Sequence, residues 1–145
     1  MRTVSRSALV PYSAAEMFAL VDDVEAYPDF LPWCSDAIVH ELDGNFQEAT
    51  LELSKGAVSN RFTTRNHRVA GEMIDIALVG GPFRHLQGGW RFQQLGDAGS
   101  KVSLALDFEF SSKIVSMMFG SFFEETCNSL VDAFTKRARD VYGDR

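Results

Sequence analysis

The strongest pattern in the chain is VSLALDFEFSSKIVSMMFGSFFEETCNSLVDAFTKRARDVY, residues 102–142. From Val102 to Phe110 large apolar residues alternate with small or polar ones, which predicts a strand with one buried face. From Lys113 to Tyr142 no proline intervenes and apolar residues recur every three to four positions, which predicts one amphipathic helix. About thirty helical residues reach on the order of 45 Å, enough to cross one face of a whole sheet. Within this helix, Gly120 is the expected point of a bend or of a close approach.

Upstream of this segment, turn signals that each contain glycine recur at short spacing. They lie at residues 43–45, 55–56, 70–71, 80–82 and 96–99. The runs between them have strand character, and Ile74, Ile76 and Leu78, for example, fall on one face. The pattern predicts an antiparallel meander.

The N-terminal part adds one more strand and two short helical segments. Residues 2–10 are rich in Val, Thr and Ser, which is typical of a strand. Ser13 and Glu16 stand at capping-box spacing, which predicts a helix immediately after that strand. A second, shorter helical turn around residues 24–27 is expected to end at Pro28.

Together these elements predict an α+β helix-grip fold over residues 1–145, as a single domain. We expect a curved antiparallel sheet of about six to seven strands, wrapped on the long C-terminal helix, with two short helices after strand 1. No segment is depleted of apolar residues, and a chain of this length supports a core of its own.

Composition and charge limit the classes of partner. Fourteen Lys and Arg against twenty Asp and Glu give a net charge of -6, which argues against binding to DNA. Two cysteines are too few for a disulfide scaffold, and no apolar run has the length needed to span a bilayer. We therefore expect a cytoplasmic protein, with peripheral contact at the inner membrane left open.

The residues that usually carry catalysis or bind metal form no recognisable site. The histidines, His40, His67 and His85, are far apart and have no ligand spacing, so no metal site is expected. No nucleophile motif is present, and no catalytic residue or required cofactor is predicted. A cyclase or hydrolase activity remains a minor alternative, for which a strongly perturbed acid or base deep in a cavity is the expected sign.

Two motifs, YPDFLPWC from Tyr27 to Cys34 and GGPFRHLQGGWRF from Gly80 to Phe92, resemble the START-like polyketide cyclase/dehydrase superfamily. Within it, the chain is similar to the family of coenzyme Q-binding proteins and RatA-type ribosome-association toxins. The resemblance implies a hydrophobic tunnel between the sheet and the long helix. It also implies two functions: binding of ubiquinone or another prenyl lipid in support of respiration, or binding of the large ribosomal subunit, which blocks subunit association.

The resemblance places one wall of the tunnel entrance at Tyr27, Phe30, Leu31, Pro32 and Trp33, and the facing wall at Pro82, Phe83, Leu86 and Trp90. The apolar pattern adds lining residues on the last strand and the helix, namely Phe108, Phe110, Met118, Phe119, Phe122 and Phe123. Such a stripe is more often plain core than a ligand site, so the case for a cavity is collective.

Polar contacts are expected at two places. The head group of a ligand would find hydrogen-bond donors in Arg84, His85 and Trp90 near the entrance. Ribosome contact is expected at the cationic strand that carries Arg61, Arg65 and Arg68.

Overall fold

Seven antiparallel strands form one sheet in the order β1-β7-β6-β5-β4-β3-β2. The structure is a computed structural model that describes residues 1–145. The strands are β1 (Arg2–Val10), β2 (Cys34–Asp43), β3 (Phe46–Lys55), β4 (Val58–Val69), β5 (Met73–Gly80), β6 (Phe83–Gln94) and β7 (Ser100–Phe110). The helices are α1 (Ala14–Asp22), the 3-10 helix η1 (Val24–Asp29) and α2 (Lys113–Tyr142). All five predicted turns separate consecutive strands, so the meander is confirmed.

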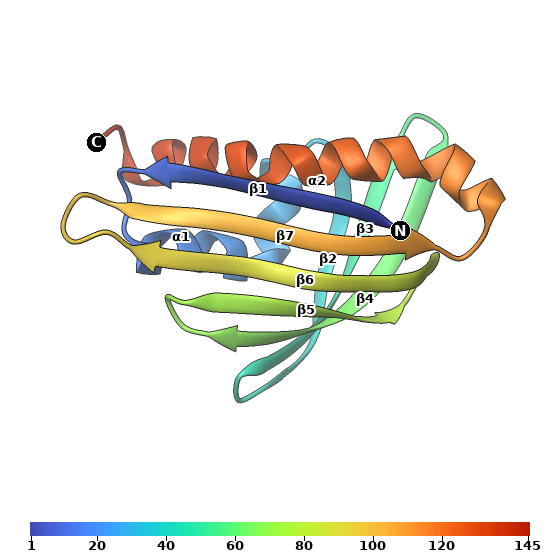
Figure 1. Ribbon diagram of the computed structural model, residues 1–145, viewed down its shortest axis with the longest axis horizontal. Coiled ribbons are helices and arrows are strands. Elements are labelled where there is room, and N and C mark those ends of the chain that lie inside the picture. The colour runs from blue at the N-terminus through green and yellow to red at the C-terminus, as the bar shows by residue number, and fades with distance from the viewer.

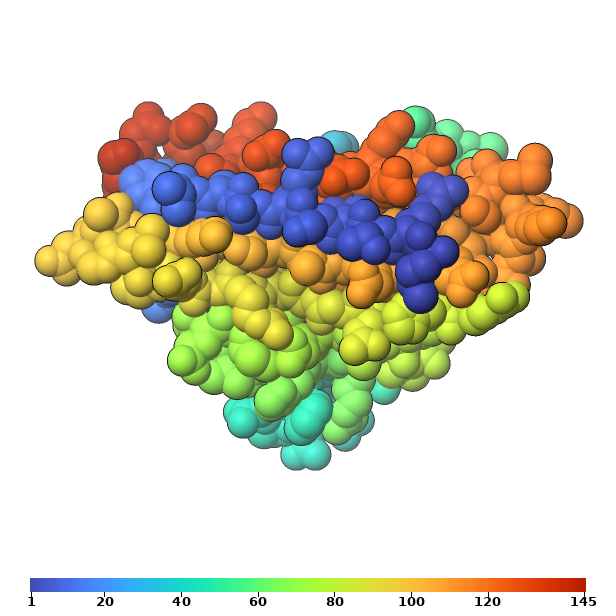
Figure 2. All heavy atoms as spheres, in the orientation of Figure 1, coloured from blue at the N-terminus to red at the C-terminus, as the bar shows by residue number.

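The sheet curves around α2. Strand β1 pairs with β7 from Arg2 opposite Phe108 to Val10 opposite Ser100, so the N-terminal strand forms one edge of the sheet and β2 forms the other. Figure 1 shows α2 running along β1 and β7, whereas β3 and β4 cross its direction. In Figure 2 the N-terminal strand forms a band between α2 and the strands β6 and β7. This curvature confirms the helix-grip fold.

The predicted capping box begins α1. The Ser13 hydroxyl accepts a hydrogen bond from the Glu16 backbone N–H at 3.0 Å, and the Glu16 carboxylate accepts one from the Ser13 N–H at 2.9 Å. The predicted end of the next turn at Pro28 is wrong, because η1 continues to Asp29. A short 3-10 helix contains few hydrogen bonds, so the missing N–H of proline is tolerated inside it.

The core lies between β7 and the middle of α2. Alternate residues of β7 from Val102 to Phe110 are all buried, as their pattern predicts. Phenylalanines fill the end of the core near the start of α2, with ring centroids 4.9 Å apart for Phe108 and Phe123. The predicted close approach at Gly120 is also present, because the Arg2 guanidinium lies where a Cβ would be.

Candidate ligand-binding site

A cavity of about 100 Å³ lies between the inner face of the sheet and α2. Seventeen of its 21 lining residues are hydrophobic, so the space is mainly apolar. Strand alternation supplies one wall, formed by Gln47, Ala49, Leu51, Leu53, Phe62, Thr64, Asn66, Ile74, Ile76, Leu86, Trp90 and Leu106. Helical spacing supplies the other, formed by Phe123, Thr126, Cys127, Leu130 and Phe134 of α2. The remaining lining residues, Val21, Val24, Tyr27 and Trp33, come from α1, η1 and the loop after η1.

Trp33 connects this cavity with the surface. Trp33 and Thr126 line both the cavity and a hollow on the outside, whose border includes Pro32, Lys55 and Phe122. The Trp33 side chain is half-buried. These two residues therefore separate the interior from the hollow, which makes this a candidate way into the cavity.

Five of the predicted lining residues surround the cavity, and they are Tyr27, Trp33, Leu86, Trp90 and Phe123. Pro32 and Phe122 border the outer hollow. The resemblance implied a hydrophobic tunnel at this place, and the space present is a cavity of about 100 Å³ that is narrowed by aromatic rings. Trp90 and Phe134, for example, meet edge to face with centroids 5.4 Å apart.

The other predicted lining residues lie outside the cavity. Four of them pack against one another and against Phe123 in the core, namely Phe83, Phe108, Phe110 and Phe119. Leu31 is buried beneath the loop, Phe30 packs on Phe134, and Pro82 lies at the β5–β6 turn. The Met118 prediction needs correction, because its side chain is 65% exposed, next to the exposed Met117 and Ile114. The helix rotates Met118 away from the sheet, whereas the neighbouring Phe119 faces inward.

Sequence reasoning missed a buried polar chain in the cavity wall. Thr64 Oγ1 donates a hydrogen bond to Asn66 Oδ1 at 2.9 Å, and Asn66 Nδ2 donates one to Gln47 Oε1 at 3.1 Å. All three side chains are buried. The one available signal was that Phe62, Thr64 and Asn66 share a face of one strand.

The titratable groups of the cavity lining are a phenol and a thiol. Burial raises the pKa of Tyr27 far above its usual value, and its hydroxyl donates to the Val21 carbonyl. Burial likewise raises the pKa of the Cys127 thiol. Both groups are therefore neutral at neutral pH, and neither is prepared to act as a base or nucleophile. No group of three or more His, Cys, Asp or Glu side chains is placed to hold a metal ion.

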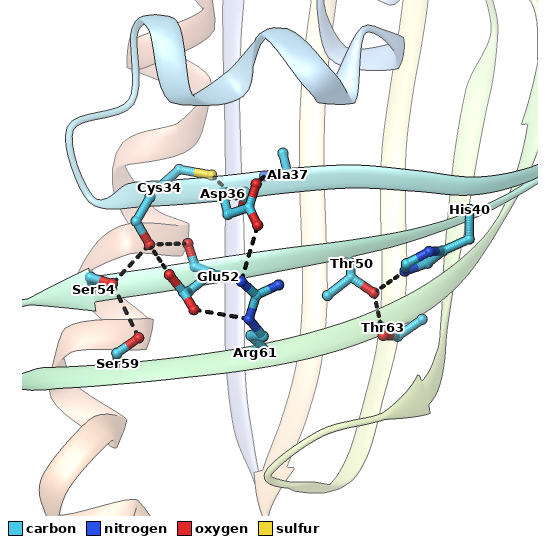
Figure 3. Close-up of polar contacts among 11 residues, drawn as sticks. Cys34, Asp36, Ala37, His40, Thr50, Glu52, Ser54, Ser59, Arg61 and Thr63 are labelled. Carbon is cyan, nitrogen blue, oxygen red and sulfur yellow. Dashed lines mark hydrogen bonds and ion pairs between the residues drawn. The ribbon is translucent and has the colours of Figure 1, made fainter.

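The three predicted ribosome contacts do not form one patch. Arg61 lies on the outer face of β4, where Asp36 at 3.0 Å and Glu52 at 2.9 Å neutralise it (Figure 3). Arg65 is on the same face, with its guanidinium 4.5 Å from the centroid of the Phe46 ring. Arg68 must be removed from this set, because strand alternation turns it to the inner face, where it pairs with Asp22.

A basic groove lies on the outer face of the sheet. Its cationic or potentially cationic residues are Arg65, His67, Arg84, His85 and Arg91. Asp75, the one acidic residue in its lining, pairs with Arg91 at 2.8 Å. Gly88 and Gly89 leave the middle of the groove without side chains. Arg84 and His85 therefore lie on the outer surface, which corrects their predicted place at the cavity entrance.

This arrangement defines a START-like domain with an internal apolar site. A family model described as polyketide cyclase / dehydrase and lipid transport matches residues 10–135. The ribosome association toxin RatA of Vibrio cholerae serotype O1 is 49% identical over 144 residues, which cover 99% of this chain and 100% of the toxin. The chain therefore belongs to the polyketide cyclase/dehydrase and lipid transport family and, within it, to the group of RatA-type and coenzyme Q-binding proteins.

One further relative supports this placement, and one solved structure has the same fold. The mitochondrial coenzyme Q-binding protein COQ10 homolog B of Xenopus laevis is 31% identical over 96% of this chain and 59% of its own length. A START superfamily protein from Mycobacterium smegmatis has a TM-score of 0.80 at 22% identity, over 96% of this chain and 98% of that chain. The second likeness concerns the fold alone. No helix of this protein has the length and apolar character needed to cross a membrane.

Proposed function

We propose that this protein binds an apolar small molecule of the ubiquinone or prenyl-lipid class between its sheet and α2, and thereby supports respiratory quinone function. The observation that carries this proposal is the apolar cavity itself, since protein interiors are otherwise packed with few voids. Each methylene that moves from water into such a site contributes about 0.8 kcal/mol, so a prenyl ligand needs few polar contacts.

The size of the cavity restricts how such a ligand binds. A dry cavity of about 150 Å³ holds one benzene ring, so the space of about 100 Å³ accommodates at most one ring-sized group. A longer tail has to leave the cavity, and the hollow outside Trp33 offers it Pro32 and Phe122 among mostly polar side chains. Binding therefore includes movement of the Trp33 side chain.

The direct test is thermal unfolding with a ubiquinone analogue that carries a decyl tail. A ligand at about 100 times its Kd stabilises the folded state by about 2.7 kcal/mol, so the melting temperature rises with concentration. The same head group without the tail serves as the control and is expected to give a smaller shift. An unchanged melting temperature with every quinone and prenyl lipid tried counts against this function.

A second candidate function is association with the large ribosomal subunit, and the outer basic groove favours it. Arg65, Arg84 and Arg91 lie along one groove despite the net charge of -6, and RNA phosphates bind such clusters by releasing counterions. Two relatives, at 49% and 43% identity, carry the name ribosome association toxin RatA, which agrees with this candidate.

Co-sedimentation with large ribosomal subunits over a range of salt concentrations tests it. The double variant Arg65→Glu with Arg84→Glu should weaken binding. It should also reduce the slope of log affinity against log salt concentration by the amount expected for the loss of about two phosphate contacts. Lys136→Glu with Arg139→Glu, on the exposed face of α2, makes the same change of charge elsewhere and should have little effect. Equal loss in both double variants, or no sedimentation at low salt, would remove the groove from consideration.

A further inference from the structure

The hydrogen-bond chain from Thr64 through Asn66 to Gln47 ends inside the cavity with an unused amide atom. Gln47 Oε1 accepts from Asn66 Nδ2, whereas Gln47 Nε2 takes part in no side-chain hydrogen bond. The Gln47 side chain is only 4% exposed and belongs to the cavity lining. Arg68 Nε is the one side-chain polar atom that is completely covered and has no hydrogen-bond partner. Gln47 Nε2 is therefore not completely covered by protein atoms. The free end of the chain therefore borders the open space of the cavity.

Such an arrangement is unusual for a site that holds only hydrocarbon. Buried amides are nearly always hydrogen-bonded, because removing their N–H from water without a partner is costly. Ala49, Leu51 and Leu53 lie on the same face of β3 and show that apolar residues fit along this wall. Gln47 thus places one free amide atom at one end of an apolar wall of β3, and Thr126 of α2 is the one polar lining residue outside the hydrogen-bond chain.

We infer that the Gln47 amide binds a single carbonyl or hydroxyl oxygen on an otherwise apolar ligand, an inference that rests on the proposed small-molecule function. In the observed arrangement Nε2 donates to a carbonyl oxygen. Rotating both amides by 180° reverses the chain, with Gln47 Nε2 donating to Asn66 and Asn66 donating to Thr64. Gln47 Oε1 then accepts from a hydroxyl group, so the same residues serve the oxidised and the reduced form of an oxygen-bearing ring.

The roles within the chain differ. Gln47 is the residue that touches the ligand. Asn66 and Thr64 are positioning residues, because they fix which amide atom of Gln47 faces the cavity. Strand pairing holds the three together, since Gln47 stands directly opposite Asn66 in the β3–β4 register.

Binding of octanophenone, a phenyl alkyl ketone, and of its analogue with C=CH2 in place of C=O tests this inference. The two compounds have nearly the same shape and differ in the oxygen acceptor. Titration calorimetry gives the ratio of the two Kd values in the wild type and in Gln47→Met, which keeps the length of the side chain but removes the amide. We expect the selectivity for the ketone to fall about tenfold in Gln47→Met, while the alkene still binds.

Thr50→Val is the matched control. Thr50 lies on the outer face of the same strand, where its hydroxyl meets His40 and Thr63 (Figure 3), so the ratio should stay at the wild-type value. Infrared spectroscopy adds a measurement on the wild type alone, in which the bound ketone should absorb at lower wavenumber than in hydrocarbon solvent.

An unchanged selectivity in Gln47→Met, or a carbonyl band at the hydrocarbon value, overturns the inference and leaves the proposed function standing. Absence of binding for both compounds in the wild type also overturns the inference, whereas the proposed function is decided separately by the thermal shift with quinones and prenyl lipids.

Discussion

Arg68 Nη1 lies 2.9 Å and 3.0 Å from the two carboxylate oxygens of Asp22, which ties β4 to the end of α1 beside the cavity. Arg68 Nε is buried without a hydrogen-bond partner, and the Asp22 carboxylate is the anion that balances the charge of the guanidinium. Asp22→Asn should lower the free energy of unfolding by about 1–3 kcal/mol, because it leaves a half-buried charge unpaired.

Asp75→Asn is the control for that prediction. It breaks the Arg91 ion pair, whose side chains are 57% and 43% exposed, and should cost at most about 1 kcal/mol. Urea unfolding of the two variants measures the difference. Equal effects would mean that the Asp22 pair does not hold the end of the cavity together.

Acid stability should depend on Glu16. Hydrogen bonds from the Arg145 guanidinium, and then from the Ser13 N–H, lower the pKa of Glu16 from 4.5 to about 2. A lowered pKa in the folded state means that the stabilisation is complete above about pH 4.5 and is lost as the pH falls toward 2. Glu16→Gln should therefore be less stable than the wild type at neutral pH, with the gap closing at acid pH.

Denaturant unfolding at several pH values checks this dependence. Glu72→Gln, at an exposed position without an ion pair, should match the wild type throughout. A gap between the wild type and Glu16→Gln that is independent of pH would contradict the role of the ion pair.

Filling the cavity should not destabilise the protein. Ala49 lines the cavity and is buried, so Ala49→Leu places added carbons in empty space and should change the free energy of unfolding by no more than about 1 kcal/mol, in the stabilising direction. Ala77→Leu on the exposed outer face is the comparison. A loss of more than about 2 kcal/mol, as expected for overpacking, would show that the space is not available.

Ligand binding should protect one of the two cysteines. Burial raises the pKa of the Cys34 thiol to about 11 and raises that of Cys127 as well, so both should react slowly with iodoacetamide at neutral pH. Octanophenone should slow Cys127 further, because Cys127 lines the cavity, and leave Cys34 unchanged. Mass spectrometry of the labelled peptides distinguishes the two sites, and equal protection of both would point to general stabilisation instead.

The fold was largely predictable because its signals are local. Each glycine-containing turn, the capping box at Ser13 and the proline-free apolar pattern of α2 specify their own segments. The end of η1 was missed because the prediction treated Pro28 as it would act in an α-helix, where proline interrupts the hydrogen bonds. A short 3-10 helix has few such bonds and can contain a proline.

The site was less predictable because it depends on contacts between distant segments. Alternation along β4 separates Arg68 from Arg65, although both belong to one run of cations in the sequence. Which aromatic residues fill the core and which leave a space is fixed by packing across the sheet and α2. Gln47 and Asn66 are 19 positions apart, and their hydrogen bond has no signature in either strand alone.

Native mass spectrometry with lipid extraction tests the central claim most directly, on wild-type protein and on Ala49→Leu purified from the same host. We expect the wild type to carry a quinone or prenyl lipid in near-stoichiometric amount and the cavity-filled variant to have lost most of it. A wild-type protein that carries no such molecule, or equal amounts of it in both proteins, would contradict the claim that this cavity is the binding site.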